Sequence, residues 1–87
     1  MYSKGQVVYS KCGRDKQNPF IVVTFDDEYV YICDGDTRKL EKPKKKNKKH
    51  IQITHKIDYN IKQKLEDNEY LLDADIRKAL AIYKVQS

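Results

Sequence analysis

The hydrophobic pattern of this 87-residue chain changes period once, near Asp58, and that change most limits how the chain can fold. Before it, apolar residues come in short runs rich in β-branched and aromatic side chains, which is typical of β-strands. From Ile57 onward, Ile57, Ile61 and Leu65 are spaced by four residues, which places them on one face of an expected helix. The sequence therefore predicts a mainly β fold with helical structure at its C-terminal end, in a chain whose length fits one small domain.

Four segments before this change are expected to be strands. Turn-favouring residues separate them, and the last alternates polar and apolar side chains with the period of two of a half-buried strand. Their ranges are 5–10, 19–25, 29–33 and 50–54. A sheet of a few short strands has two exposed edges, and closing the sheet into a barrel removes them. We therefore expect a small antiparallel barrel over residues 1–56.

Two short helices are expected in residues 57–87. Asp58 suits the N-cap of the first, because its carboxylate can accept a hydrogen bond from an unpaired backbone N–H, and Asn68 is expected to end that helix. Asp73 is expected to cap the second. The apolar stripe of the second helix consists of Ile76, Ala79, Leu80 and Tyr83. Helices this short are marginal alone, so we expect them to pack on each other or on the barrel.

Positive charge is concentrated in the middle of the chain. Residues 38–56 carry nine basic side chains and one acidic, or +8, whereas the two flanks together carry nine basic and twelve acidic, or −3. The densest part is the basic loop 38–49, where eight of twelve residues are Lys or Arg. Concentrated cationic charge binds polyphosphate by releasing its counterions. Because lysine is a point charge, the loop suits phosphate contact more than base reading.

The order of these segments resembles the KOW domain, the SH3-like barrel of ribosomal proteins and transcription elongation factors. The residues that carry the resemblance are Gly-Gln-Val-Val at 5–8, Lys-Cys-Gly-Arg-Asp at 11–15 and the strand 20–25. The run Asn-Lys-Lys-His-Ile at 47–51 is similar to an Asn-x-Lys-His-Leu segment of archaeal and eukaryotic large-subunit ribosomal proteins of the fourteen-e type. Bacterial KOW proteins fit equally well. Two positions depart from the pattern of this family. Cys12 stands where a small residue is usual, and Lys48 stands where the residue is commonly apolar.

The resemblance implies a contact with structured RNA, ribosomal or ribosome-associated, made by two basic loops of the barrel. Gly13 is expected to adopt positive φ and so to shape the first loop around Arg14. Together, the resemblance and the charge pattern give a candidate RNA-binding set: Lys11, Gly13, Arg14, Lys16, Arg38, Lys39, Lys42, Lys44, Lys45, Lys46, Asn47, Lys48, Lys49 and His50.

An alternative function belongs to another class. In this alternative the chain is a protein-interaction module associated with the translation or transcription machinery, which binds its partner through the barrel or the C-terminal helices. The basic loop then only aids solubility or contacts an acidic surface. The seven tyrosines could stack on unpaired bases, although Tyr29, Tyr31 and Tyr83 are more typical of packing.

Catalysis and metal binding have little support in the sequence. No phosphate-cradling or nucleophile motif is present, so we do not expect an enzyme. His50 and His55 have the spacing of a zinc-finger histidine pair but lack a Cys-x2-Cys partner, so no metal or cofactor is expected. With no signal-peptide pattern and no long apolar run, the sequence predicts a cytoplasmic protein without a membrane contact. In that compartment Cys12 and Cys33 are expected to be free thiols.

Overall fold

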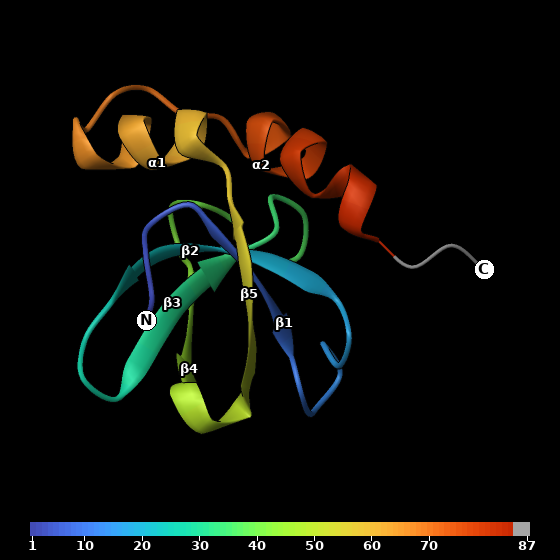
Figure 1. The fold of residues 1–87 in the computed structure, drawn as a ribbon. Helices are drawn as coiled ribbons and strands as arrows, with labels where there is room; N and C mark the ends of the chain where they lie inside the picture. Colours follow the sequence, from blue (N-terminus) through green and yellow to red (C-terminus); the bar gives the residue numbers. More distant parts are fainter. Residues whose placement is uncertain (85–87) are drawn as a thin grey trace.

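A computed structural model describes residues 1–84 of the chain, and this part forms a five-stranded antiparallel sheet followed by two α-helices (Figure 1). The strands are β1 (Gln6–Ser10), β2 (Pro19–Phe25), β3 (Tyr29–Cys33), β4 (Lys44–Asn47) and β5 (Ile51–Ile57). The helices are α1 (Tyr59–Glu66) and α2 (Asp73–Leu80), and two 3₁₀ turns, η1 (Lys48–His50) and η2 (Ala81–Tyr83), follow β4 and α2. The predicted class, mainly β with two C-terminal helices, is confirmed. No helix among these residues is long and apolar enough to cross a membrane.

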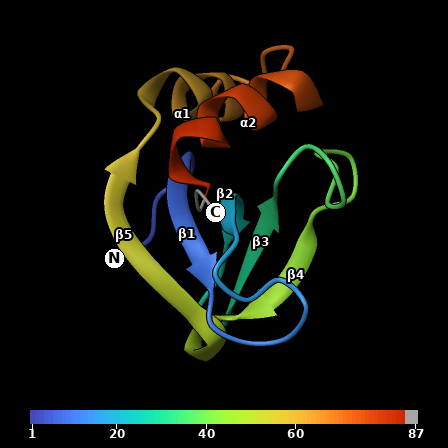
Figure 2. The same cartoon turned by 90° about the vertical axis from the view of Figure 1, so that its right-hand side faces the viewer.

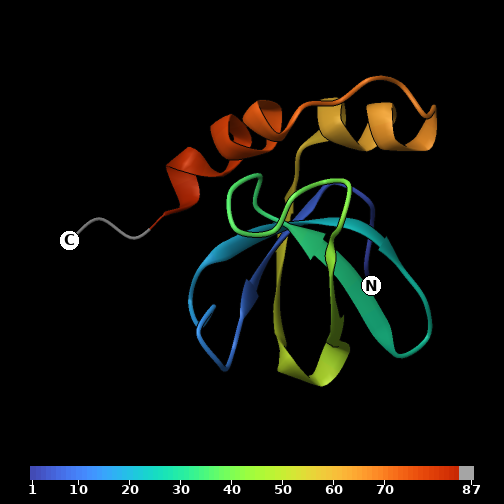
Figure 3. The same cartoon turned by 180° about the vertical axis from the view of Figure 1, so that it is seen from behind.

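The strands lie in the order β4-β3-β2-β1-β5, so the last strand returns to pair with the first. The pairing register shifts between Gln6 and Val8 in β1 and between Val22 and Thr24 in β2. Such irregularities increase local twist and bend a sheet. The sheet is accordingly curled, and its two edge strands, β4 and β5, are joined directly by η1 (Figures 2 and 3).

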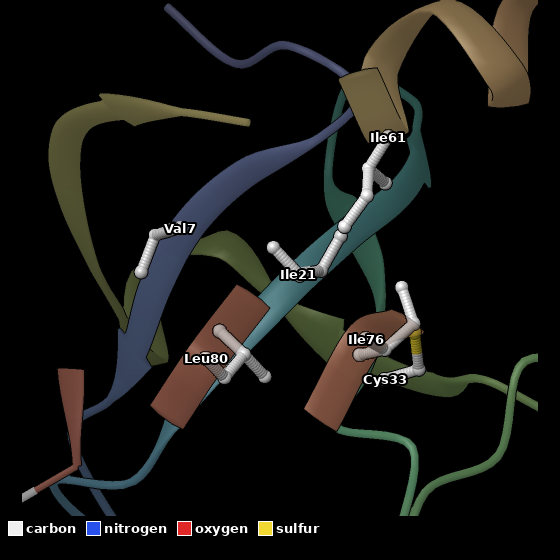
Figure 4. Close-up of a cluster of buried hydrophobic side chains, with 6 residues drawn as sticks. All are labelled: Val7, Ile21, Cys33, Ile61, Ile76 and Leu80. Atoms are coloured by element: carbon white, nitrogen blue, oxygen red, sulfur yellow. The ribbon is translucent and has the colours of Figure 1, made fainter. Parts of the chain in front are cut away.

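Both faces of the sheet are apolar. Successive residues of its central strands are apolar, and neighbouring side chains along a strand point to opposite faces. One cluster packs across the curl, from β3 to β5, and consists of Val8, Phe20, Val22, Val30, Ile32 and Ile51. The other face presents Val7, Ile21 and Cys33, which contact the helices (Figure 4). Ile61 of α1 and Ile76 and Leu80 of α2 complete this second cluster. The expectation that the helices pack on the strands is confirmed.

The basic loop 38–49 is shorter than the sequence predicted, because residues 44–47 form β4. This strand pairs with β3, with Lys46 opposite Val30 and Lys44 opposite Ile32. Lysine has a low strand propensity, but it suits an edge strand, where its charge discourages pairing with another chain. The lysines of β4 are therefore held at fixed positions on the sheet edge.

The structure corrects two element boundaries. The first strand begins at Gln6, one residue later than predicted, and the last strand runs from Ile51 to Ile57, beyond the predicted range 50–54. The extension of β5 brings it directly to α1 and includes Ile57, so the prediction that Ile57 shares a helical face with Ile61 and Leu65 is wrong for Ile57. The carboxylate of Asp58 caps α1 as predicted, accepting a hydrogen bond from the Ile61 N–H at 3.0 Å.

The prediction that Asp73 caps α2 is wrong. The N-cap of α2 is Leu72, whose own N–H donates to the carboxylate of Asp75 at 3.0 Å. The carboxylate of Asp73 instead accepts a hydrogen bond from the Leu40 N–H at 2.8 Å. Asp73 therefore ties the segment between β3 and β4 to the first turn of α2, a long-range role that its local sequence could not indicate.

Candidate nucleic-acid interface

Loop 11–18 connects β1 to β2 and is held in a tight shape by its own backbone. Gly13 has a φ of +77°, as the sequence predicted, and its carbonyl accepts a hydrogen bond from the Lys16 N–H at 3.2 Å. Gln17 also has positive φ, +67°, and its N–H donates to the Ser10 carbonyl at 2.8 Å. These turns leave three cationic side chains of the loop exposed to solvent: Lys11, Arg14 and Lys16.

Hydrogen bonds hold this loop against the second basic segment, residues 38–50. The Lys11 N–H donates to the carbonyl of His50 at 2.8 Å, which extends the pairing of β1 with β5 into the loop. On the other side, the Nζ of Lys46 lies 3.5 Å from the carbonyl of Cys12 and donates to it. Figure 2 shows the loop passing beside β4. The two predicted RNA-facing segments, far apart in the sequence, thus lie side by side.

An ion pair provides a third link between them. The guanidinium of Arg38 lies 3.3 Å from the carboxylate of Asp15, and both side chains are shielded from solvent over most of their surface. The Nε of Arg38 is buried and has no hydrogen-bond partner within the described residues. Arg38 therefore serves first to hold the loop in place, although the sequence indicated it as a phosphate ligand.

We name loop 11–18 and segment 38–50 together the basic surface; it contains eleven Lys or Arg residues and two acidic residues. The exposed cations on it are Lys11, Arg14, Lys16, Lys39, Lys42, Lys45 and Lys49. A hollow of about 470 Å³ lies between Thr37 and Lys44, lined mostly by the basic side chains of this stretch. Asn47 has a structural role: its carboxamide oxygen accepts the Lys49 N–H at 3.0 Å and caps η1.

Two lysines of this surface lie over aromatic rings, an arrangement that the sequence did not reveal. The Nζ of Lys45 is 4.3 Å from the ring centre of Tyr29. That of Lys48 is 5.0 Å from the ring centre of Tyr2 and 5.6 Å from that of Phe25. Each contact is a cation–π interaction, which restrains the long lysine side chain and leaves its charge near solvent. Tyr2 is partly buried, and this burial raises the pKa of its hydroxyl group.

Acidic groups mark the limit of the basic surface. Asp34 follows β3, and its carboxylate accepts the backbone N–H groups of Asp36 and Arg38 at 2.9 and 2.8 Å. A groove of about 620 Å³ next to Arg14 is lined by side chains of both signs, including Asp34 and Asp36. At the opposite end of β3, N–H groups of Tyr29 and Glu28 lower the pKa of Asp26. The lysines of β4, which pairs with β3, therefore lie between these two acidic turns.

Among residues 1–84, no three His, Cys, Asp or Glu side chains lie close enough together to hold a metal ion. Cys12 is partly buried and Cys33 is fully buried, and both are free thiols. Burial raises the pKa of the Cys33 thiol to about 12, with smaller contributions from Asp73 and Asp34. No protein-family model matches this chain, and no curated protein matches it.

Proposed function

We propose that this protein is a non-catalytic RNA-binding protein that docks on structured RNA through the basic surface. The observation that carries the proposal is the joining of loop 11–18 to segment 38–50. Three contacts, at Lys11, Arg38 and Lys46, bring cations from two distant parts of the sequence onto one continuous surface. A chain that needed lysine only for solubility would not require these contacts.

The docking mechanism is electrostatic and depends on a preformed scaffold. The strands fix the backbone of β4, while the ion pair of Arg38 with Asp15 and the hydrogen bond from Lys46 fix the loop beside it. Exposed lysines then meet phosphates without a large ordering cost, and the release of condensed counterions drives association. Phosphate contacts of this kind position a protein on RNA through backbone shape and carry little sequence information.

The finer identity of the fold and the RNA is also part of the proposal. Five antiparallel strands in which the last returns to pair with the first, after a 3₁₀ turn, support an SH3-like barrel of the KOW kind. Gly13 in a positive-φ turn between β1 and β2 supports the same assignment. On this reading the RNA is ribosomal or ribosome-associated and the protein acts in the cytoplasm during translation.

A protein-interaction module is the second candidate, and a specific observation favours it. Four large apolar side chains of the C-terminal region are exposed: Tyr59, Tyr70, Leu72 and Ile82. The most exposed, Tyr70 and Ile82, keep 82% and 81% of their surface accessible. These residues belong to the helical region and are not part of the basic surface, so a protein partner on the helices is compatible with RNA on the loops.

The two functions are separated by isolating the protein from cells without nuclease and washing it at high salt. An RNA-binding protein should carry nucleic acid that the wash removes, which lowers the ratio of nucleic-acid to protein absorbance. Sequencing RNA cross-linked to the protein in cells then tests whether ribosomal RNA is enriched. Preparations free of nucleic acid before the wash, with no enriched cross-linked RNA, would favour the protein-interaction module.

A further inference from the structure

A hollow of about 620 Å³ opens beside the basic surface, between β1, loop 11–18, β5 and η2. Its volume lies within the range of about 300–1,000 Å³ that is typical of small-ligand sites. Aromatic side chains line two sides, Tyr9 from β1 and Tyr83 from η2, and both are half-buried. The Tyr9 hydroxyl donates to the Tyr83 carbonyl at 3.4 Å, so the end of the helical region is linked to the sheet at this point. We name it the tyrosine hollow.

Amide groups stand beside the rings. Gln52 of β5 is paired directly with Tyr9 of β1, so their side chains emerge next to each other on the same face of the sheet. Gln17 faces the hollow from loop 11–18, where its positive φ and its hydrogen bond to Ser10 fix the backbone. Both glutamine side chains are exposed. A carboxamide both donates and accepts hydrogen bonds, which is the pairing chemistry of a nucleobase edge.

Two cations connect the tyrosine hollow to the basic surface. Lys11 and Lys16 line the hollow and belong to loop 11–18 as well, and both are exposed. A ligand in the hollow would thus have a π face against tyrosine, polar edges near glutamine and an anionic group near lysine. A nucleotide has all three features, and aromatic stacking of unpaired bases is a common mode of RNA recognition.

We propose that the tyrosine hollow holds one unpaired nucleotide of the RNA that the basic surface binds. This inference rests on the proposed function and deepens it: the preferred target is a helix with a bulged or looped-out base, not a fully paired helix. Lys11 and Lys16 serve both sites, which argues for a nucleotide of the same RNA and against a separate small molecule. The basic surface supplies most of the affinity, and the hollow selects the position along the RNA.

The test compares two RNA hairpins with the same stem, one fully paired and one with a single bulged 2-aminopurine. Both are titrated with the full-length protein, and affinity and 2-aminopurine fluorescence are recorded. Stacking on an aromatic ring quenches this fluorophore, so we expect a loss of fluorescence and about tenfold tighter binding of the bulged hairpin. Adenosine monophosphate serves as a competitor, and we expect it to displace the bulged hairpin only weakly.

Variants assign the effect to the hollow. Tyr9→Phe should keep the quenching, whereas Tyr9→Ala should abolish it and reduce the preference for the bulge to nearly nothing. Gln52→Ala, at an exposed position, should lower that preference about threefold through a lost hydrogen bond. The matched controls are Tyr70→Ala and Gln63→Ala, exposed residues that do not line the hollow. They should leave both readouts unchanged.

Failure of this inference is distinguishable from failure of the proposed function. Equal affinity for the two hairpins, without quenching, would overturn the base site while leaving RNA binding in place. Adenosine monophosphate binding as tightly as the bulged hairpin would make the hollow a small-molecule site and overturn the inference as well. If neither hairpin binds, both the base site and the proposed function are wrong.

Discussion

Gly35 follows β3 and lies directly beneath the first turn of α2, so Gly35→Ala tests how the helix docks on the sheet. Its φ is +77°, and an added Cβ would overlap the Asp73 carbonyl and lie 3.1 Å from the Cγ of Arg77. Arg77 also donates to the Gly35 carbonyl at 2.6 Å, so the helix and the turn are already in close contact there. Alanine at this position cannot be accommodated unless α2 moves.

Two effects set the magnitude. Placing a residue with a Cβ in the left-handed region costs about 1–2 kcal/mol, and crowding a packed site costs about 1–3 kcal/mol more. We therefore expect Gly35→Ala to lower the free energy of unfolding by about 2–5 kcal/mol. Gly13→Ala is the matched control, because Gly13 has the same φ of +77° but its nearest added contact is the Lys46 Nζ at 3.9 Å. Gly13→Ala should lower the free energy of unfolding only through the cost of the left-handed backbone conformation, about 1–2 kcal/mol.

Urea unfolding followed by circular dichroism measures both variants against the natural chain. The effect of alanine on the unfolded chain is the same at either position, so the difference between the variants isolates the crowding under α2. We expect Gly35→Ala to be the less stable by about 1–3 kcal/mol. Equal destabilisation by the two substitutions would refute the close approach of α2 to the turn that follows β3.

Three further predictions concern two side chains of the fold, Asp58 and Cys33. Asp58→Ala removes the cap of α1 and should lower the free energy of unfolding by about 1 kcal/mol. The control Asp27→Ala, in an exposed turn, should change the free energy of unfolding little. Urea unfolding measures both variants, and equal effects would contradict the capping role of Asp58. Cys33 should resist a thiol reagent in the native state while Cys12 reacts, and two reactive thiols in the native protein would contradict its burial. Because burial raises the folded-state pKa of Cys33 from 9.0 to about 12, its stabilising contribution is complete below pH 9 and is lost as the pH rises toward 12. This decline should be absent from Cys33→Ala, and an equal decline in that variant would assign it to other groups.

Local patterns predicted most of the fold. The apolar runs of β2 and β3 and the cap at Asp58 agree with the structure residue by residue, because each depends on neighbours within a few positions. β4 was missed because its lysines have low strand propensity, and it forms only because β3 presents a free edge for pairing. Asp73 was misassigned because its hydrogen-bond partner, Leu40, is distant in the sequence.

The sequence predicted which residues give the candidate site its charge, but not how these residues lie relative to one another. Charge and the positive φ of Gly13 could be read from the sequence. The contact of Lys46 with Cys12, the rings under Lys45 and Lys48, and the pairing of Tyr9 with Gln52 all require strands that are distant in the chain to meet. The tyrosine hollow therefore has no signal in the sequence alone, and only the topology that places β5 beside β1 brings its residues together.

The central claim is that exposed cations of the basic surface meet RNA phosphates, and the salt dependence of binding tests it most directly. The test variant replaces Lys39, Lys42 and Lys49 with Gln, and the matched control replaces three lysines of the helices, Lys62, Lys64 and Lys78, with the same loss of charge. Each phosphate contact contributes about 0.7–0.9 to the slope of log affinity against log salt. We expect the test variant to flatten this slope by about 2–3 and to weaken binding, while the control keeps the natural slope. A slope that the test variant leaves unchanged, or that both variants lower equally, would contradict a defined phosphate-binding surface on the two loops.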